Sequence, residues 1–418
     1  MKILFLAYAC EPNSGSEYGV GWEVPSRMAK SHSDDEIFII TRSRCKEKIK
    51  EALSAMGLPN FHVLFFDIPK VLYYKNEMHS KWGEQFNYII WQLWVKRFVR
   101  NTDAEIGFDI IHHLTFNQYR TPSPGFWMKQ PFVMGPVGGA ECIAPAFWED
   151  LLPHTKRKEK LRAKGVDLSF FGWLCKRSKN KKLILCSSQR DIERLLPFAS
   201  NCEVKKMPAI AFSDDIKNII NEQKPVNSFE KFRIIYAGRA LDWKGLHIFL
   251  KAVHNAYILN NIVDFQIQLV GIRFQEEQER VKQWITEQNL IEYVELIPFV
   301  PQQELLEIEA NCDLFVYPAF RDSGSMSVLE ACALGLTSIC FDAGGQDIFP
   351  DDVLIKIPIG NTYQECQDVF SDRLQWAYNN RASIKKLGQY AQKWVRENLT
   401  WEQKIDTFVL LYNGLLVN

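Results

Sequence analysis

The sequence predicts an α/β protein built from two doubly wound domains that face each other across a cleft. The chain has 418 residues, which is too long for one ordinary hydrophobic core. Apolar strand-like segments alternate with helical segments in two successive series, and periodicity fades between them. We therefore expect an N-terminal domain over residues 1–205, a linker over 206–231 and a C-terminal domain over 232–398. We expect the last helix, residues 399–418, to pack back toward the N-terminal domain.

Composition narrows the class of partner. Hydrophobic residues make up 47% of the chain, as in a globular protein, and the formal net charge is zero. Residues 1–205 hold 30 of the 50 Lys+Arg but only 22 of the 50 Asp+Glu. A basic first half fits an anionic ligand or a membrane surface. No compact basic stripe with a nucleic-acid-binding motif is present, so we expect no nucleic-acid partner.

Three features of the sequence favour a cytoplasmic location. The ten cysteines show no CxxC pair and no Cys/His metal spacing, which indicates free thiols in a reducing compartment. The opening MKILFLAYAC resembles a lipoprotein signal, but its apolar run is short, and we interpret it as the first buried strand. No segment reaches the length of apolar sequence that a spanning helix needs.

Strand-like segments of the first domain are bounded by loops that carry glycine or histidine. The strands are predicted at Ile3–Ala9, Glu36–Thr41, Phe61–Phe66, Asp109–Thr115, Pro131–Ala140 and Lys182–Ser188. After the first strand, Gly15, Gly19 and Gly21 form a glycine-rich turn before a helix. Their spacing is only a weak phosphate-loop signal, and a flexible turn is an equal alternative.

Aromatic and basic residues mix along residues 75–100, a long helical stretch of the first domain. Its end, Trp91 to Arg100, suits a membrane interface or a lipid-tailed acceptor, although a helix packed on the sheet with a solvated basic face fits as well. Lys156–Lys164 and Lys176–Lys182 are two further basic clusters, which are either solvated helical faces or contacts for anionic lipid.

The second domain carries the clearest ligand site. Its strands are predicted at Phe232–Tyr236, Phe265–Val270, Val294–Pro298, Leu314–Tyr317 and Thr337–Phe341. Asp322 and Ser323 follow the fourth of these strands, and Ser325 or Ser327 caps the next helix, which contains Glu330 and stops at Gly335. Ligands of open α/β sheets bind at this edge, where helix N-termini receive phosphate or sugar oxygens.

Two cations come to the same sheet edge from another strand. Arg239 and Lys244 follow Phe232–Tyr236 within the segment Gly238–Gly245. A guanidinium fork and an ammonium beside a helix N-terminus suit a diphosphate. The alternative is an exposed loop with two scattered cations.

Together these residues resemble the retaining glycosyltransferases of family 4, among the glycosyl transferases of group 1. The resemblance is carried by Gly238-Arg239 with Lys244, by Asp322 with Glu330 in an E-x7-E arrangement, and by Gly344-Gly345 after a strand. It is specific over residues 234–347 and looser through the first domain. It implies the GT-B architecture, in which two Rossmann-like domains face each other across a cleft.

The resemblance assigns roles to the residues of the second domain. Arg239 and Lys244 would bind the pyrophosphate of a nucleotide-sugar donor, beside Gly238. Glu330 would hold the ribose, and Asp322 would face the transferred sugar. The sugar or its phosphates would also contact the loop amides, which belong to Ser323, Gly324, Ser325 and Met326.

In the first domain, the resemblance implies that the Gly15 turn closes over the phosphates or the acceptor. It also implies a donor-site histidine, for which we favour His113 over His112. Two departures from the family pattern are visible: Asp322 is one methylene shorter than the usual glutamate, and Ser323-Gly324-Ser325 replaces Gly-Phe-Gly. The segment Met207–Ala211 also lacks the Asn-Gly often found there.

The implied activity is retaining transfer of a hexose-type sugar, from a UDP-sugar rather than a GDP-sugar on family frequency. The acceptor would be a saccharide or a lipid-linked saccharide in surface polysaccharide biosynthesis. The aromatic and basic segments of the first domain, rather than the resemblance, suit peripheral contact at the inner face of the membrane. None of the predicted loops at the strand ends contains an Asp-x-Asp metal-binding motif. We therefore expect no metal and no other cofactor. The alternatives are a nucleotide-sugar epimerase on the same scaffold and a catalytically silent sugar-nucleotide-binding protein.

Overall fold

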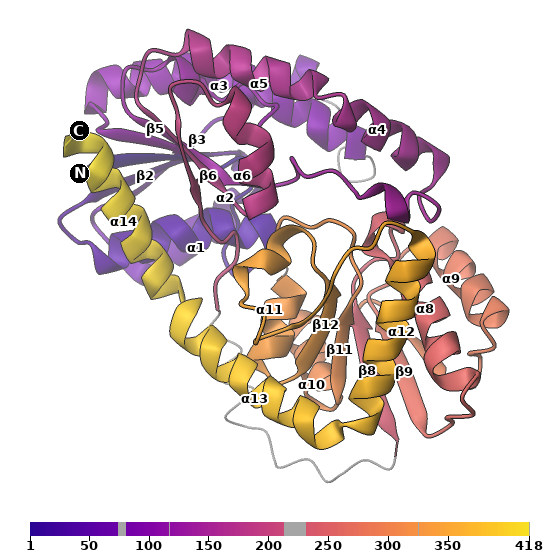
Figure 1. Cartoon of the computed structure of the whole chain (residues 1–418). Helices are drawn as coiled ribbons and strands as arrows, with labels where there is room; N and C mark the ends of the chain where they lie inside the picture. The colour runs from indigo at the N-terminus through magenta and orange to yellow at the C-terminus, as the bar shows by residue number, and fades with distance from the viewer. Residues whose placement is uncertain (74–80, 117, 213–230, 325, 418) are drawn as a thin grey trace. The chain divides into compact units, whose positions relative to one another are not determined.

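The chain folds into two compact α/β units (Figure 1). The computed structural model describes residues 1–73, 81–116, 118–212, 231–324 and 326–417. Unit 1 comprises Met1–Ala140, Gly165–Ala209 and Trp401–Asn418, and unit 2 comprises Glu141–Lys164 and Ile210–Thr400. Each unit contains its own parallel sheet, which confirms the predicted fold class.

The sheet of unit 1 is parallel and has the order β3-β2-β1-β4-β5-β6-β7. Its strands are β1 (Lys2–Leu6), β2 (Glu36–Thr41), β3 (Phe61–Phe65), β4 (Ile110–His113), β5 (Phe132–Val137), β6 (Lys182–Cys186) and β7 (Glu203–Lys206). The chain order reverses beside β1, which pairs with β2 on one side and with β4 on the other. Residues 3–6 of β1 are fully buried, as expected for a central parallel strand covered on both faces.

The helices of unit 1 cover both faces of this sheet. They are α1 (Ser16–Ser31), α2 (Lys46–Met56), α3 (Lys81–Ile106), α5 (Val166–Arg177), α6 (Gln189–Leu195) and α14 (Trp401–Val417). Tyr88, Trp91, Val95 and Val99 of α3 share one core cluster with Leu168, Phe171 and Leu174 of α5, so these two helices lie on the same face. In Figure 1 they lie above the sheet and α1 lies below it.

The sheet of unit 2 is also parallel and has the order β10-β9-β8-β11-β12-β13. Its strands are β8 (Phe232–Ala237), β9 (Phe265–Val270), β10 (Val294–Ile297), β11 (Leu314–Tyr317), β12 (Thr337–Phe341) and β13 (Ile355–Ile357). Its helices are α4 (Pro153–Ala163), α8 (Leu246–Val253), α9 (Gln275–Glu287), α10 (Gln302–Ala310), α11 (Met326–Ala333), α12 (Tyr363–Asn379) and α13 (Arg381–Asn398).

The predicted strands lie where the sequence placed them, within a few residues at their ends. Two edge strands, β7 and β13, were not predicted, because both are short and β7 is rich in lysine and largely exposed. The helix predicted over residues 75–100 is described from Lys81 and continues to Ile106; residues 74–80 lie outside the described part.

The domain boundaries differ from the predicted ones in one place. Residues 141–164 were assigned to the N-terminal domain, but they pack in unit 2. The ring of Phe147 stacks on that of Phe320, with centroids 4.0 Å apart, and Glu159 pairs with Arg321 at 2.5 Å. Most of the predicted linker, residues 213–230, lies outside the described residues.

Helix α14 belongs to unit 1, although it follows unit 2 in the sequence. The hydroxyl of Tyr412 is 2.5 Å from Nδ1 of the buried His112 on β4, and Phe408 packs on the same imidazole. The ammonium of Lys404, 5% exposed, donates to the carbonyl of Ala209 at 2.8 Å. The C-terminal helix is thus held by buried polar contacts as well as by apolar packing.

Across the described residues, no helix is both long enough and apolar enough to cross a membrane.

Lys404→Met is expected to change how stability depends on pH. Burial lowers the pKa of Lys404 from 10.5 to about 7, so between these values the unfolded chain binds a proton that the folded protein does not. The free energy of unfolding of the wild type should therefore gain a contribution that rises with pH above 7, by up to about 1.4 kcal/mol per pH unit. Urea unfolding at several pH values should show that the free energy of unfolding of Lys404→Met lacks this increase with pH. The increase should be kept in Lys30→Met, which alters an exposed lysine of α1.

Candidate functional site

Two loops that carry predicted residues lie at one edge of the sheet of unit 2. β8 lies between β9 and β11 in the sheet, so the chain order reverses beside it, and ligands of open α/β sheets bind at such a point. Gly238 and Arg239 follow β8, and Asp322 and Ser323 follow β11. The predicted residues of the second domain therefore share one edge of one sheet.

Lys244 and Asp322 form the centre of this cluster. The ammonium of Lys244 donates to Oδ2 of Asp322 and to the hydroxyl of Tyr317, both at 2.5 Å, and Tyr317 also donates to Asp322. Burial opposes ionisation of Asp322, but the charge and hydrogen bond of Lys244 outweigh it and lower the pKa of the carboxyl. Two of the three N–H donors of the ammonium are used by these partners, which leaves one for a ligand.

Glycines keep the two loops in contact. A Cβ on Gly245, whose φ is +67°, would lie 1.9 Å from the carbonyl oxygen of Pro318. A Cβ on Gly344, at φ +60°, would lie 2.2 Å from the carbonyl oxygen of Asp322, and the amide of Gly345 donates to that oxygen at 2.7 Å. The Gly344-Gly345 pair is thus required by the close approach of its loop to Asp322.

Arg239 is held by an acid of α9. Its Nη2 donates to Oε1 of Glu277 at 2.5 Å, and its guanidinium lies over the ring of Phe274. Its buried Nε has no hydrogen-bond partner among the described residues. The side chain of Arg239 is 33% exposed, so other N–H groups of its guanidinium are accessible to an anionic ligand.

Glu330 lies on α11, and its carboxyl is buried among polar groups of α10. Oε1 of Glu330 accepts a hydrogen bond from Gln302 at 2.5 Å. Burial raises the pKa of Glu330 to about 7. Burial, and then the charge of Glu330, also raise the pKa of Glu309 well above its usual value. Like charges this close disfavour double ionisation, so the pair holds at least one proton near neutral pH.

Some backbone amides of the loop between β11 and α11 donate hydrogen bonds to acceptors within the same loop. The amide of Gly324 donates to Oδ1 of Asp322 at 3.3 Å, and the amide of Met326 donates to the carbonyl of Gly324 at 3.0 Å. Two of the amides predicted to contact the sugar therefore have partners within the loop here. Ser325 lies outside the described residues, and a sugar contact by this loop stays a prediction.

The segment 141–164 reaches this site through Glu159. Its carboxyl, 2% exposed, accepts from Arg321 at 2.5 Å and from the amide of Ile143 at 3.1 Å. Arg321 directly precedes Asp322, so helix α4 helps to hold the loop that carries the predicted sugar contact.

The histidines and the glycine turn belong to unit 1. Nε2 of His113 is 3.1 Å from the hydroxyl of Tyr88, and burial lowers the pKa of His113 to about 4. His112, with a pKa lowered to about 3 by burial, is 2.9 Å from the carbonyl of Gly135. Both imidazoles are fully buried and neutral, and a donor contact by His113 stays a prediction. Gly15 precedes α1, and its role also stays a prediction.

Unit 1 has a pocket of about 550 Å³ where β1, β2 and β3 end, lined by Tyr8, Arg42, Ser43, Arg44, Asp67, Ile68, Lys70, Tyr73, Asn87 and Trp91. The guanidinium of Arg42 donates to the hydroxyls of Tyr8 and Tyr73, at 2.8 and 2.9 Å. Three cations and one carboxylate among aromatic walls suit a ligand with a ring and an anionic or hydroxyl-rich group.

Sequence reasoning missed several residues that the structure brings together. Tyr317, Glu277 and Gln302 contact Asp322, Arg239 and Glu330, respectively. The sequence could have indicated Tyr317 and Arg42 as site residues, because each lies at the end of a predicted strand or directly after it. No local pattern in the sequence indicates Glu277 or Gln302, since they belong to helices that only tertiary packing brings to the site.

No group of three or more His, Cys, Asp or Glu side chains among the described residues is arranged to hold a metal ion.

The arrangement of two parallel-sheet units is the GT-B fold. Sucrose-phosphate synthase from Thermosynechococcus elongatus superposes with a TM-score of 0.66 at 14% identity, over 100% of this chain and 99% of that chain. HepE from Anabaena, in complex with UDP and glucose, superposes with a TM-score of 0.61 at 16% identity, over 99% of this chain and 100% of that chain. At these identities the likeness establishes the fold alone.

The sequence comparisons agree with the family resemblance. Residues 218–394, which are less than half of the chain, match the model of the glycosyl transferases group 1. The D-inositol 3-phosphate glycosyltransferase of Paenarthrobacter aurescens (strain TC1) is 23% identical over 192 residues. That alignment covers 45% of this chain and 46% of the relative. The family resemblance seen in the sequence is therefore confirmed.

Glu309→Gln is expected to flatten the pH dependence of stability. Since the pKa values of Glu309 and Glu330 are raised, the folded protein keeps protons that the unfolded chain releases above about 4.5. The free energy of unfolding of the wild type should fall as the pH rises from about 4.5 through 7. It should fall less in the variant, because the variant has one buried carboxyl fewer. Urea unfolding at pH 5 and pH 8 measures this difference. Glu307→Gln, at an exposed position of the same helix, should behave as wild type, and parallel curves for all three proteins would refute the shared proton.

Proposed function

We propose that the protein is a retaining glycosyltransferase that moves a hexose-type sugar from a nucleotide diphosphate sugar to a saccharide or lipid-linked acceptor. UDP is the preferred nucleotide over GDP, and the product enters a surface polysaccharide. The observation that carries the proposal is Lys244, which Asp322 holds at 2.5 Å where β8 and β11 end. The ten free cysteines support a reducing compartment, so we place the reaction in the cytoplasm.

Donor binding follows from the charges of the site. Arg239 and Lys244 are each paired with one carboxylate, and their side chains are 33% and 20% exposed, so both have N–H groups that a phosphate oxygen can reach. The carboxyl pair of α10 and α11 offers both an acceptor and a donor, because it holds a proton near neutral pH. Such a pair can bind the two hydroxyls of a ribose, with Glu330 in direct contact.

The transfer step needs stabilisation of a leaving group more than a protein base. The bond between the anomeric carbon and the donor phosphate oxygen breaks, and a bond to the acceptor oxygen forms on the same face of the sugar. The departing phosphate oxygen takes the acceptor's proton, so charges balance without a side-chain base. Lys244 and Arg239 stabilise the negative charge that grows on the nucleoside diphosphate.

The acceptor has a suitable place in unit 1. The pocket where β1, β2 and β3 end combines the aromatic rings of Tyr8 and Trp91 with the cations of Arg42 and Arg44. Aromatic rings pack on sugar rings, and the guanidinium groups can bind hydroxyl or phosphate oxygens of the acceptor.

Lys244→Met and Glu330→Ala should each lower transfer by about 10²-fold or more, because each removes a side-chain contact to the donor. Released nucleotide and glycosylated product are measured with UDP- and GDP-sugars and a panel of saccharide and lipid-linked acceptors. Lys282→Met, an exposed lysine of α9, is the matched control and should keep full activity.

The outcomes of this assay separate the candidate functions. Epimerised donor without transfer identifies an epimerase, and nucleotide binding without turnover identifies a silent binding protein. Wild-type transfer rates in both variants, with folding verified by circular dichroism, would refute the assigned donor site.

Transfer should persist, within about twofold, after treatment with EDTA, because the charge on the leaving diphosphate is balanced here by Arg239 and Lys244. The rate is compared before chelation, after it, and after addition of Mg²⁺ or Mn²⁺. A loss on chelation that either metal restores would contradict metal-independent transfer.

A further inference from the structure

The outer face of α3 exposes large apolar side chains at helical spacing. Phe86, Ile89, Leu93 and Trp94 are 50%, 44%, 49% and 44% exposed. Other side chains of the same helix, including Tyr88 and Val95, are fully buried against the sheet of unit 1. The helix is therefore apolar on two sides, and a contiguous exposed apolar face marks an interaction surface.

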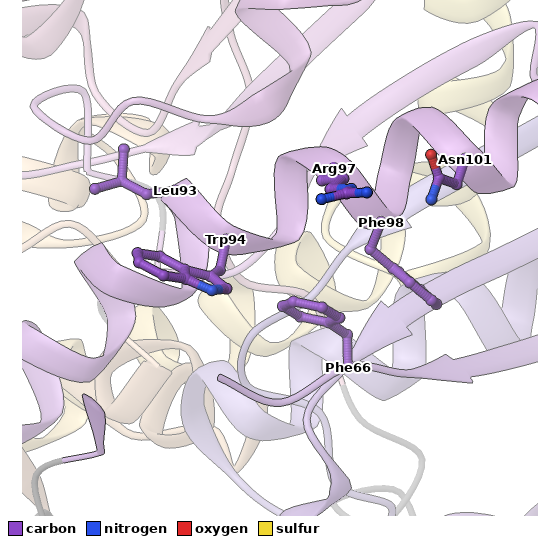
Figure 2. A pocket seen from close by; sticks show the side chains of 6 residues that line it. All are labelled: Phe66, Leu93, Trp94, Arg97, Phe98 and Asn101. Carbon is purple, nitrogen blue, oxygen red and sulfur yellow. The ribbon is translucent and has the colours of Figure 1, made fainter. Parts of the chain in front are cut away.

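A hollow opens along this face, as Figure 2 shows. Its volume is about 390 Å³, and it is lined by Phe66, Leu93, Trp94, Arg97, Phe98 and Asn101. The rings of Phe66 and Phe98 stack with centroids 5.2 Å apart and form its apolar floor. Arg97 and Asn101 provide polar groups at its border. The hollow is thus apolar inside and cationic at one side.

Helix α5 repeats the pattern on the same face of unit 1. Phe170 and Trp173 are 41% and 47% exposed, and their rings stack with centroids 5.8 Å apart. Both α3 and α5 contact the short helix Pro124–Trp127, and their inner sides share one core cluster. Figure 1 shows the two helices above the sheet, so the sides of α3 and α5 that do not pack on the core both face away from the sheet in the same general direction.

Cations follow the apolar residues on both helices. Arg97 and Arg100 are exposed toward the end of α3, and Lys176 and Arg177 are exposed at the end of α5. The exposed stripes thus hold six large apolar residues and four cations, and no acid: Phe86, Ile89, Leu93, Trp94, Arg97, Arg100, Phe170, Trp173, Lys176 and Arg177.

The acidic residues near these stripes do not offset the cations. Asp103 of α3 accepts hydrogen bonds from Gln130, and Asp167 at the start of α5 accepts one from Tyr119. Glu105 is exposed in the last turn of α3, beyond the apolar stripe. The surface therefore complements an anionic partner.

We infer that this outer face of α3 and α5 is a docking surface for an anionic lipid bilayer. Trp and Phe side chains of this kind settle at the level of the lipid headgroups, and Arg and Lys contact the lipid phosphates. Exposed aromatic side chains beside four exposed cations, with no acid between them, fit the headgroup layer of an anionic bilayer. The inference is independent of the glycosyl transfer proposed above.

Not every basic cluster predicted from the sequence belongs to this face. Lys156–Lys164 lies in α4 of unit 2, where Glu159 is engaged in the site. Lys176 and Arg177, from the other cluster, are part of the surface. Helix α4 therefore supplies a control of similar charge.

The test is sedimentation of the full chain with phosphatidylcholine vesicles, with and without phosphatidylglycerol. The wild type should bind the anionic vesicles at least about tenfold better than the neutral ones, and high salt should weaken binding. Trp94→Ser with Trp173→Ser, and separately Arg97→Glu with Arg100→Glu, should each reduce binding about tenfold or more. Two control variants should bind like wild type: Leu410→Ser on α14, and Arg157→Glu with Lys160→Glu on α4.

Two results would overturn the assignment. One is a wild type that stays in the supernatant with anionic vesicles, or variants that bind as well as the wild type. The other is concentration-dependent self-association that the Trp94 and Trp173 substitutions abolish, which would make the face an interface between copies of the chain. Thermal unfolding of every variant verifies that a loss of binding is not a loss of fold.

Discussion

The ion pair between Lys244 and Asp322 is the contact on which the site of unit 2 depends. The side chain of Asp322 is only 17% exposed, and a carboxylate largely removed from water is costly unless a cation and hydrogen bonds compensate it. Lys244 and Tyr317 provide that compensation, and they tie the loop after β8 to the loop after β11. Gly344 and Gly345 let a third loop close on the same backbone. The ion pair thus fixes the position of the Lys244 ammonium and of the loop after β11, which leads into α11.

The site handles its buried acids in two different ways. Asp322 and Glu277 are paired with cations, which are themselves the groups that a diphosphate requires. Glu309 and Glu330 have no such partner, so burial raises their pKa values and a proton is retained. The result is one region that attracts anions and another that exchanges hydrogen bonds with neutral hydroxyl groups. This division matches the two halves of the nucleoside diphosphate in the donor that we propose.

Each unit contains a segment that is separated in sequence from the rest of that unit. Residues 141–164 leave the first half of the chain and pack in unit 2, where Glu159 holds Arg321. Helix α14 returns to unit 1, where Tyr412 meets His112. In both cases a buried polar contact accompanies the apolar packing, and such contacts are specific because an unpaired partner would be costly. Each unit therefore depends on a segment that is distant in sequence.

The sequence by itself determined the two parallel sheets, most of their strands and the chemical types at the ends of β8 and β11. Apolar runs bounded by glycine and polar residues are local signals, and they were sufficient for these features. Only the tertiary structure decided that Tyr317, Glu277 and Gln302 complete the site, and that α4 belongs to unit 2. It also showed that one side of α3 and α5 remains exposed. Partners that come from separate helices leave no local pattern, because their proximity arises from packing between elements far apart in the chain.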